Sequence, residues 1–181
     1  TGHEFDGGFA QYMLLNSDML RFGPVTPIPE GTSYEAAALA EPLACALHGL
    51  ELAQFAPGKS LVVIGLGPIG IMLLQLGRAF GASKVFGVQR SAKRLEMARE
   101  FLPEGRFIST NDEDAVEVVM EETHGLGADC VITSAGTVQS HIDAINMVAH
   151  RGYVNLFGGL RNEPKLSIDS NIIHYKECFV T

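Results

Sequence analysis

Short apolar runs alternate with longer segments of mixed polarity through the last two thirds of the chain. Their sequences are LVVIG at 61–65, KVFGV at 84–88, RFIS at 106–109, DCVIT at 129–133, GYVNLF at 152–157 and ECFVT at 177–181. The runs begin about 22 to 25 residues apart and are nearly all apolar. This pattern predicts strands that are buried on both faces of a parallel sheet.

Between the first five runs, apolar residues recur at the three- and four-residue spacing of a helix. The four stripes are Ile69, Met72, Leu73, Leu76 and Phe80; Leu95, Ala98, Phe101 and Leu102; Val116, Val119 and Met120; Val138, Ile142, Ile145 and Ala149. Gly81, Gly125 and Gly127 stand where helices should end. Strands that alternate with helices predict right-handed βαβ units and an α/β domain with helices on both faces of the sheet.

The first 30 residues have a different pattern. The stretches DGGFAQYMLL at 6–15 and FGPVTPIPEG at 22–31 are rich in Gly and Pro and contain only short extended runs. We expect them to belong to a β-rich neighbour of the sheet domain. Residues 33–55 predict a helix, which Pro42 should break near Glu41. The predicted division of the chain is therefore 1–32 and 33–181.

Composition supports one packed domain and narrows the choice of partners. The chain has 181 residues, of which 46% are hydrophobic, and its charge of 13 − 21 = −8 disfavours nucleic acid and anionic membranes. The three cysteines, Cys45, Cys130 and Cys178, are scattered, which favours a reducing, cytoplasmic compartment. We expect Cys45 to lie in the core. Because the chain starts at Thr1 and not at Met, we expect a processed N-terminus or a fragment.

The sequence GLGPIG at 65–70 follows the first predicted strand and opens the first predicted helix. In that context Gly65 permits a tight turn, Gly67 lets a pyrophosphate approach the backbone, and Gly70 lets the helix pack on the strand. The loop, including Pro68 and Ile69, therefore predicts dinucleotide binding at a helix N-terminus. The alternative is an ordinary strand-to-helix turn with no ligand.

The second predicted strand ends at Gln89, where NAD-binding domains place an acid that accepts hydrogen bonds from the ribose. Arg90, Lys93 and Arg94 follow, around the N-cap residue Ser91. Cations at a helix N-terminus oppose its dipole, and a bound 2′-phosphate would reverse this repulsion. The pattern favours NADP(H) over NAD(H), with Arg90, Arg94 and Ser91 as phosphate ligands. The alternative is a solvated basic patch.

Several stretches together resemble the medium-chain dehydrogenase/reductase family, in its zinc-containing alcohol, sorbitol and threonine dehydrogenase branch. They are GGFAQY at 7–12, AALAEPLACALHGLE at 37–51, GLGPIG at 65–70, GLGADCVITSAG at 125–136, GYVNLFGG at 152–159 and NIIHYKE at 171–177. The resemblance implies a six-stranded, doubly wound Rossmann domain at 33–181 and a remnant of a β-rich, GroES-like catalytic domain at 1–32. It also implies hydride transfer between a nicotinamide cofactor and a secondary alcohol or its ketone.

The same resemblance implies site residues and an assembly. Glu41 falls at a zinc-ligand position of this branch, and Ala135, Leu156 and Phe157 would lie beside the nicotinamide. The segment 165–168 would be an edge strand that pairs across a two-fold axis, which implies a homodimer or a homotetramer. The other interpretation of Glu41 is a carboxylate stabilised by the dipole at a helix N-terminus.

The family's Cys and His zinc ligands, proton relay and four-cysteine zinc loop have no counterpart in this sequence, so no catalytic residue is assigned. Alone, the chain is expected to be incomplete as an enzyme. Two further interpretations therefore stay open beside the zinc-type dehydrogenase. One is a zinc-free quinone or enoyl reductase relative, and the other is a non-catalytic nucleotide-binding module.

Overall fold

The computed structural model describes residues 5–23, 25–160 and 166–181. The chain forms two compact units, Thr1–Ala38 and Leu39–Thr181. The division lies a few residues after the predicted boundary between 32 and 33.

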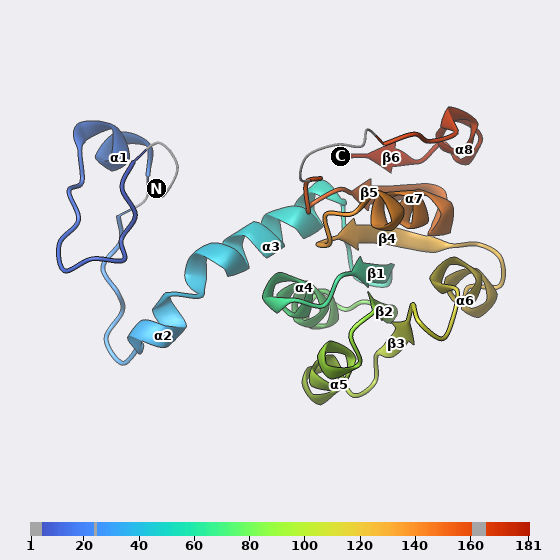
Figure 1. Cartoon of the computed structure of the whole chain (residues 1–181), viewed down its shortest axis with the longest axis horizontal. Coiled ribbons are helices and arrows are strands. Elements are labelled where there is room, and N and C mark those ends of the chain that lie inside the picture. Colours follow the sequence, from blue (N-terminus) through green and yellow to red (C-terminus); the bar gives the residue numbers. More distant parts are fainter. Residues whose placement is uncertain (1–4, 24, 161–165) are drawn as a thin grey trace. The chain divides into compact units, whose positions relative to one another are not determined.

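The second unit is built on six parallel strands in the order β3-β2-β1-β4-β5-β6 (Figure 1). The strands are β1 (Ser60–Ile64), β2 (Lys84–Gln89), β3 (Arg106–Ser109), β4 (Ala128–Thr133), β5 (Val148–Asn155) and β6 (Phe179–Val180). Every predicted run forms a strand, and the order is that of a doubly wound Rossmann fold with its switch point between β1 and β4. The predicted fold class is confirmed.

Helices cover both faces of this sheet. They are α3 (Ala40–Leu52), α4 (Pro68–Ala79), α5 (Ala92–Phe101), α6 (Ala115–Glu122), α7 (Val138–Met147) and α8 (Ser170–Lys176). Strand β1 shows why two layers are needed, because its side chains alternate between two cores. Leu61 and Val63 pack with residues of α3, α4 and α5, whereas Val62 and Ile64 pack with residues of α6 and α7. Figure 1 shows α4 and α5 on one side of the sheet and α6 on the other.

Helix α8, between β5 and β6, was not expected from the sequence. It has only seven residues and buries none of them, so its apolar periodicity is weak. Its ends carry clearer signals: the Asp169 carboxylate accepts a hydrogen bond from Asn171 N at 2.9 Å, and Glu177 ends the helix in the left-handed conformation with φ 49°.

The predicted helix over 33–55 is interrupted, but not where we expected. The break comes at Ala38 and Leu39, between α2 (Tyr34–Ala37) and α3. Pro42 lies inside the first turn of α3 and continues the helix, because a proline in the first turn removes no intrahelical hydrogen bond. The prediction that Pro42 breaks the helix was wrong.

Among its described residues, 5–23 and 25–38, the first unit contains helices α1 (Ser17–Phe22) and α2 and no strand. Its expected extended runs therefore do not pair with one another there. The predicted edge strand at 165–168 falls partly outside the described residues, since Lys165 is not among them, and residues 166–168 form no strand. No helix within the described residues combines the length and apolarity needed to cross a membrane.

Candidate functional site

The turn between β1 and α4 has two glycines that the packing requires and one that faces open space. Gly65 has φ +96°, and a Cβ there would lie 2.9 Å from the Cβ of Ala135. A Cβ on Gly70 would overlap the carbonyl oxygen of Gly65. A Cβ on Gly67 would meet nothing within 4 Å. The backbone at Gly67 is therefore open to a ligand, as the motif predicts.

The N-terminus of α4 presents free amide groups at this turn. Gly67 is the N-cap and has no side chain to cap the helix, and Pro68 at the first position has no N–H. The first helical bond runs from Ile71 N to Gly67 O at 2.9 Å, so the amides of Ile69 and Gly70 precede it. Free amides at the positive end of a helix dipole suit an anion such as a phosphate.

A cavity of about 360 Å³ opens at the carboxyl ends of β1 to β4. Its lining residues are Ile64, Gly65, Val88, Gln89, Arg90, Thr110, Ala135, Thr137, Gln139, Ser140 and Asp143. Four of these, Gly65, Gln89, Arg90 and Ala135, were predicted from the sequence. A crevice outside the carboxyl ends of the strands, at the switch point, is where open α/β sheets bind ligands.

The side-chain carbonyl group of Gln89, at the end of β2, already accepts two hydrogen bonds within the protein. Its Oε1 accepts hydrogen bonds from the backbone amides of Arg90 at 2.7 Å and Ser91 at 3.3 Å. Ser91 is the N-cap of α5 by position, as expected, but its side chain makes no capping hydrogen bond. Because the backbone donors require an acceptor, the Gln89 amide NH₂ is the part of this side chain that remains for a ligand.

The basic residues after β2 differ in their access to the cavity. Arg90 is exposed and lines it, and the Asn111 amide holds the Arg90 carbonyl at 2.9 Å. Lys93 and Arg94 lie exposed in the first turn of α5, outside the cavity lining. Within the described ranges none of the three cations forms an ion pair. Arg90 is therefore the cation best placed to meet a ligand.

The opposite wall comes from the N-terminus of α7, which we did not single out from the sequence. Thr137 and Ser140 form a capping box, and Ser140 Oγ also donates to the Ala135 carbonyl at 2.7 Å. One turn further, Gln139 Nε2 donates to Asp143 Oδ1 at 2.7 Å. Burial raises the pKa of Asp143, and the negative charge of Asp114 raises it further. The hydrogen bond from Gln139 lowers the pKa and offsets part of this rise.

Thr110 and the α7 residues could have been found from the sequence by one rule. Thr110 follows β3 directly, and Thr137 follows β4 after a short loop. Because the carboxyl ends of parallel strands share one edge of the sheet, polar residues just beyond each strand converge there. Asp143 follows less readily, because it lies in the second turn of a helix.

Leu156 and Phe157 lie directly after β5, half-buried and outside the cavity lining. Phe157 packs on the α3 side of the sheet, where a Cβ on Gly49 would come within 3.0 Å of its ring. Leu156 packs on the other side, and its amide donates to Thr181 O at 2.8 Å. A hydrogen bond from Gly158 N to Thr133 O, at 2.6 Å, joins the segment after β5 to the end of β4.

Glu41, the expected metal ligand, lies in the first turn of α3. Its Oε1 accepts a hydrogen bond from Cys45 Sγ at 3.2 Å, and this bond raises the pKa of the Cys45 thiol. Cys45 is half-exposed, so our assignment of it to the core was wrong. Among the described residues no group of three His, Cys, Asp or Glu side chains gathers to hold a metal ion. The described part of the chain thus supplies too few donors for zinc.

The fold and the cavity define a Rossmann-type dinucleotide-binding domain, and comparison with known proteins gives its family. The family described as zinc-binding dehydrogenase matches residues 68–180. D-xylulose reductase A of Aspergillus oryzae is 36% identical over 164 residues, 88% of this chain and 44% of its own. Sorbitol dehydrogenase of Halalkalibacterium halodurans is 31% identical over 181 residues, 99% of this chain and 50% of its own. The chain belongs to the zinc-binding dehydrogenase family.

Solved structures agree with this assignment. Alcohol dehydrogenase TADH from Thermus sp. ATN1 superposes with a TM-score of 0.78 at 31% identity, over 85% of this chain and 44% of its own. A zinc-binding dehydrogenase from Sinorhizobium meliloti, bound to NADP, gives a TM-score of 0.77 at 29% identity, over 84% of this chain and 45% of its own. The chain spans about half the length of these relatives and corresponds to their nucleotide-binding part.

Proposed function

We propose that this chain is the cofactor-binding part of a zinc-type alcohol or polyol dehydrogenase. The reaction would be hydride transfer between NADP(H) and a secondary alcohol or its ketone. The cavity at the carboxyl ends of β1 to β4 carries the proposal, because Gly65 of the glycine turn and the cation Arg90 both line it. The names of the relatives, sorbitol dehydrogenase and D-xylulose reductase, support the substrate class.

In the proposed complex the pyrophosphate lies at the N-terminus of α4. The amides of Ile69 and Gly70 donate to it, and the absence of a Cβ at Gly67 leaves it room. The adenosine ribose lies beside Gln89 and Arg90 at the end of β2. This places the dinucleotide across the switch point of the sheet, as in other Rossmann domains.

Preference for NADP(H) over NAD(H) follows from the polar groups at the end of β2. The Gln89 carbonyl is occupied by two backbone amides, so it is not the acceptor that an acid offers to a 2′-hydroxyl. Arg90 is free to pair with a 2′-phosphate, and Arg94 and Ser91 extend the same helix N-terminus toward it. Charge-assisted bonds of this kind are about twice as strong as neutral ones.

The remaining roles belong to the intact enzyme. Ala135, Leu156 and Phe157 would border the nicotinamide at the ends of β4 and β5. Glu41 would be one zinc ligand, and zinc would polarise the substrate oxygen. The described residues do not bring two further His, Cys, Asp or Glu donors to Glu41, as a zinc site would need. A homodimer or homotetramer in the cytoplasm completes the proposal, and the three free cysteines favour that compartment.

Calorimetric titration of the chain with NADP⁺ and NAD⁺ tests the proposal. We expect NADP⁺ to bind at least about tenfold more tightly, the equivalent of about 1.4 kcal/mol. Arg90→Ala should remove most of that difference, because a hydrogen bond to a charged group contributes about 1.5–3 kcal/mol.

Arg99→Ala is the matched control. It removes the same charge from the last turn of α5, away from the cavity, and should leave the ratio unchanged. Equal affinities of the unmodified chain for the two dinucleotides would refute the NADP preference. Absence of binding by both would refute the proposed function itself.

A further inference from the structure

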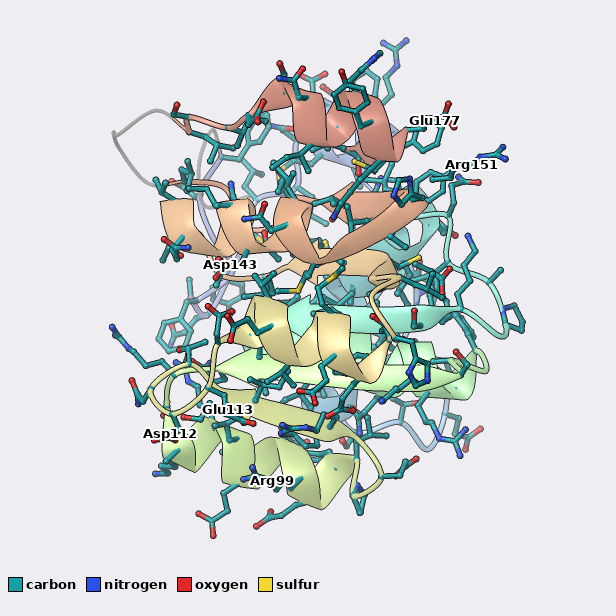
Figure 2. The ribbon with its side chains drawn as sticks, turned by 90° about the vertical axis from the view of Figure 1, so that its right-hand side faces the viewer. Arg99, Asp112, Glu113, Asp143, Arg151 and Glu177 are labelled. Atoms are coloured by element: carbon teal, nitrogen blue, oxygen red, sulfur yellow. The ribbon has the colours of Figure 1, made fainter. Side chains whose placement is uncertain are left out.

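The cavity at the carboxyl ends of β1 to β4 is lined by a basic side chain, Arg90, and by an acidic one, Asp143. Arg90 enters it from the end of β2, and Asp143 from the second turn of α7. Figure 2 shows Asp143 on the edge of α7 that faces α6. The proposed phosphate contacts account for Arg90, but they give no role to a carboxylate in the same cavity.

The structural surroundings of Asp143 do not account for it either. Among the described residues its side chain has a single hydrogen-bond partner, Gln139 of the same helix, and no cation. It is half-buried, and the charge of Asp114 at the N-terminus of α6 adds to the rise in its pKa. Burial removes hydration from the ionised Asp143 carboxylate, and Asp114 repels it. The hydrogen bond from Gln139 offsets part of this cost, and the described residues supply no compensation for the rest.

A hydrogen-bond donor from a ligand would supply that compensation. Gln139 holds Oδ1 of Asp143 at 2.7 Å, so Oδ2 is left as an acceptor. Of the parts of an adenine dinucleotide, the exocyclic amine of the base is a neutral donor that a carboxylate accepts well. A base with a carbonyl oxygen at the same position, such as hypoxanthine, would instead set two acceptors against each other.

We propose that Asp143, oriented by Gln139, selects the adenine base of the dinucleotide by accepting a hydrogen bond from its exocyclic amine. This inference rests on the proposed function and adds a specificity residue to it. The cavity then recognises the two polar features of the adenosine half separately, with Arg90 at the phosphate and Asp143 at the base. The raised pKa of Asp143 agrees with a half-buried carboxylate that the protein stabilises through one hydrogen bond among the described residues.

The test compares NADP⁺ with nicotinamide hypoxanthine dinucleotide phosphate, in which a carbonyl oxygen replaces the exocyclic amine and the adjacent ring nitrogen N1 carries a proton. Calorimetry on the full chain should show the adenine form binding about tenfold or more tightly, because the hypoxanthine form leaves a charged acceptor unpaired. In Asp143→Asn the side chain keeps its size and offers both an acceptor and a donor. The preference should then fall to about threefold or less.

Asp112→Asn is the matched control, since Asp112 is an exposed acid after β3 that does not line the cavity (Figure 2). It should retain the full preference for adenine. Equal binding of both dinucleotides to the unmodified chain, or an undiminished preference in Asp143→Asn, would overturn the inference and leave the proposed function standing. If neither dinucleotide binds, the proposed function fails first. The comparison of the two dinucleotides on the unmodified chain tests the inference even if Asp143→Asn does not fold.

Discussion

Gly67 and Gly70 stand three residues apart in one turn, yet the structure gives them different tasks. Gly67 has backbone angles that any residue adopts, φ −82° and ψ −172°, and open space where a Cβ would be. Gly70 is buried, with the Gly65 carbonyl in the place of its Cβ. The first glycine therefore leaves room for the proposed ligand, and the second serves the packing of α4 on β1.

Alanine at each position separates these tasks. Gly67→Ala should leave the free energy of unfolding almost unchanged and weaken NADP⁺ binding tenfold or more, because the methyl group occupies the pyrophosphate position. Gly70→Ala should lower the free energy of unfolding by about 1–3 kcal/mol, the usual cost of overpacking. Urea denaturation and calorimetry measure the two effects. A destabilised Gly67→Ala that still binds NADP⁺ would contradict this division.

At the scale of elements, one group of charges joins α6 to the strands beside it. Glu122 at the end of α6 forms two ion pairs. Its Oε1 lies 2.7 Å from Nε of Arg106 in β3, and its Oε2 lies 2.5 Å from Nζ of Lys84 in β2. Arg106 also reaches Glu113, before α6, at 2.6 Å. Burial alone would raise the pKa of Glu122, but the bonds from Lys84 and Arg106 outweigh it and lower the pKa.

This lowered pKa predicts a pH-dependent contribution to stability. The folded state favours ionised Glu122, so its contribution is present above the ordinary Glu pKa of about 4.3 and disappears as the pH falls through the lower folded pKa. Glu122→Gln should therefore lower the free energy of unfolding at pH 7 by about 1 kcal/mol, with the difference vanishing toward pH 3.

Chemical denaturation across this pH range measures the effect. Glu121→Gln is the control, because the neighbouring Glu121 is exposed and forms no ion pair among the described residues. A loss of stability in Glu122→Gln that is equally large at pH 3 would show that its contribution is not electrostatic.

At the scale of the whole molecule, all residues of both hydrophobic cores come from the unit Leu39–Thr181. The central strands of this unit are also joined at their start, where the Asp129 carboxylate of β4 accepts hydrogen bonds from Ser60 N at 2.8 Å and Ser60 Oγ at 2.7 Å. The unit thus contains its own sheet, both helical layers and the whole cavity.

Removal of residues 1–38 should therefore leave a chain that unfolds in one cooperative transition. We expect it to bind NADP⁺ within about threefold of the longer chain, because no cavity residue is lost. Thermal denaturation and calorimetry on the shortened protein test this. Non-cooperative melting, or loss of NADP⁺ binding, would show that Thr1–Ala38 supports the sheet domain.

The sequence alone determined the sheet, four of its helices and the glycine turn. These features depend on local periodicity and on residues close in the chain, such as the alternation of Leu61 to Ile64 between two cores. It missed α8, which buries too little to show a period, and misplaced the helix break at Pro42, because proline acts differently in a first turn. The sequence also indicated Gly65, Gln89 and Arg90 as site residues, since each ends a strand or follows one directly.

Only the tertiary structure placed Asp143 in one cavity with Arg90, beside Thr110 and Gln139. These residues come from three different βα units, and no local pattern relates an acid in the second turn of α7 to a cation after β2. Parallel strands bring their carboxyl ends to one edge of the sheet, and the distances there depend on strand order and helix placement.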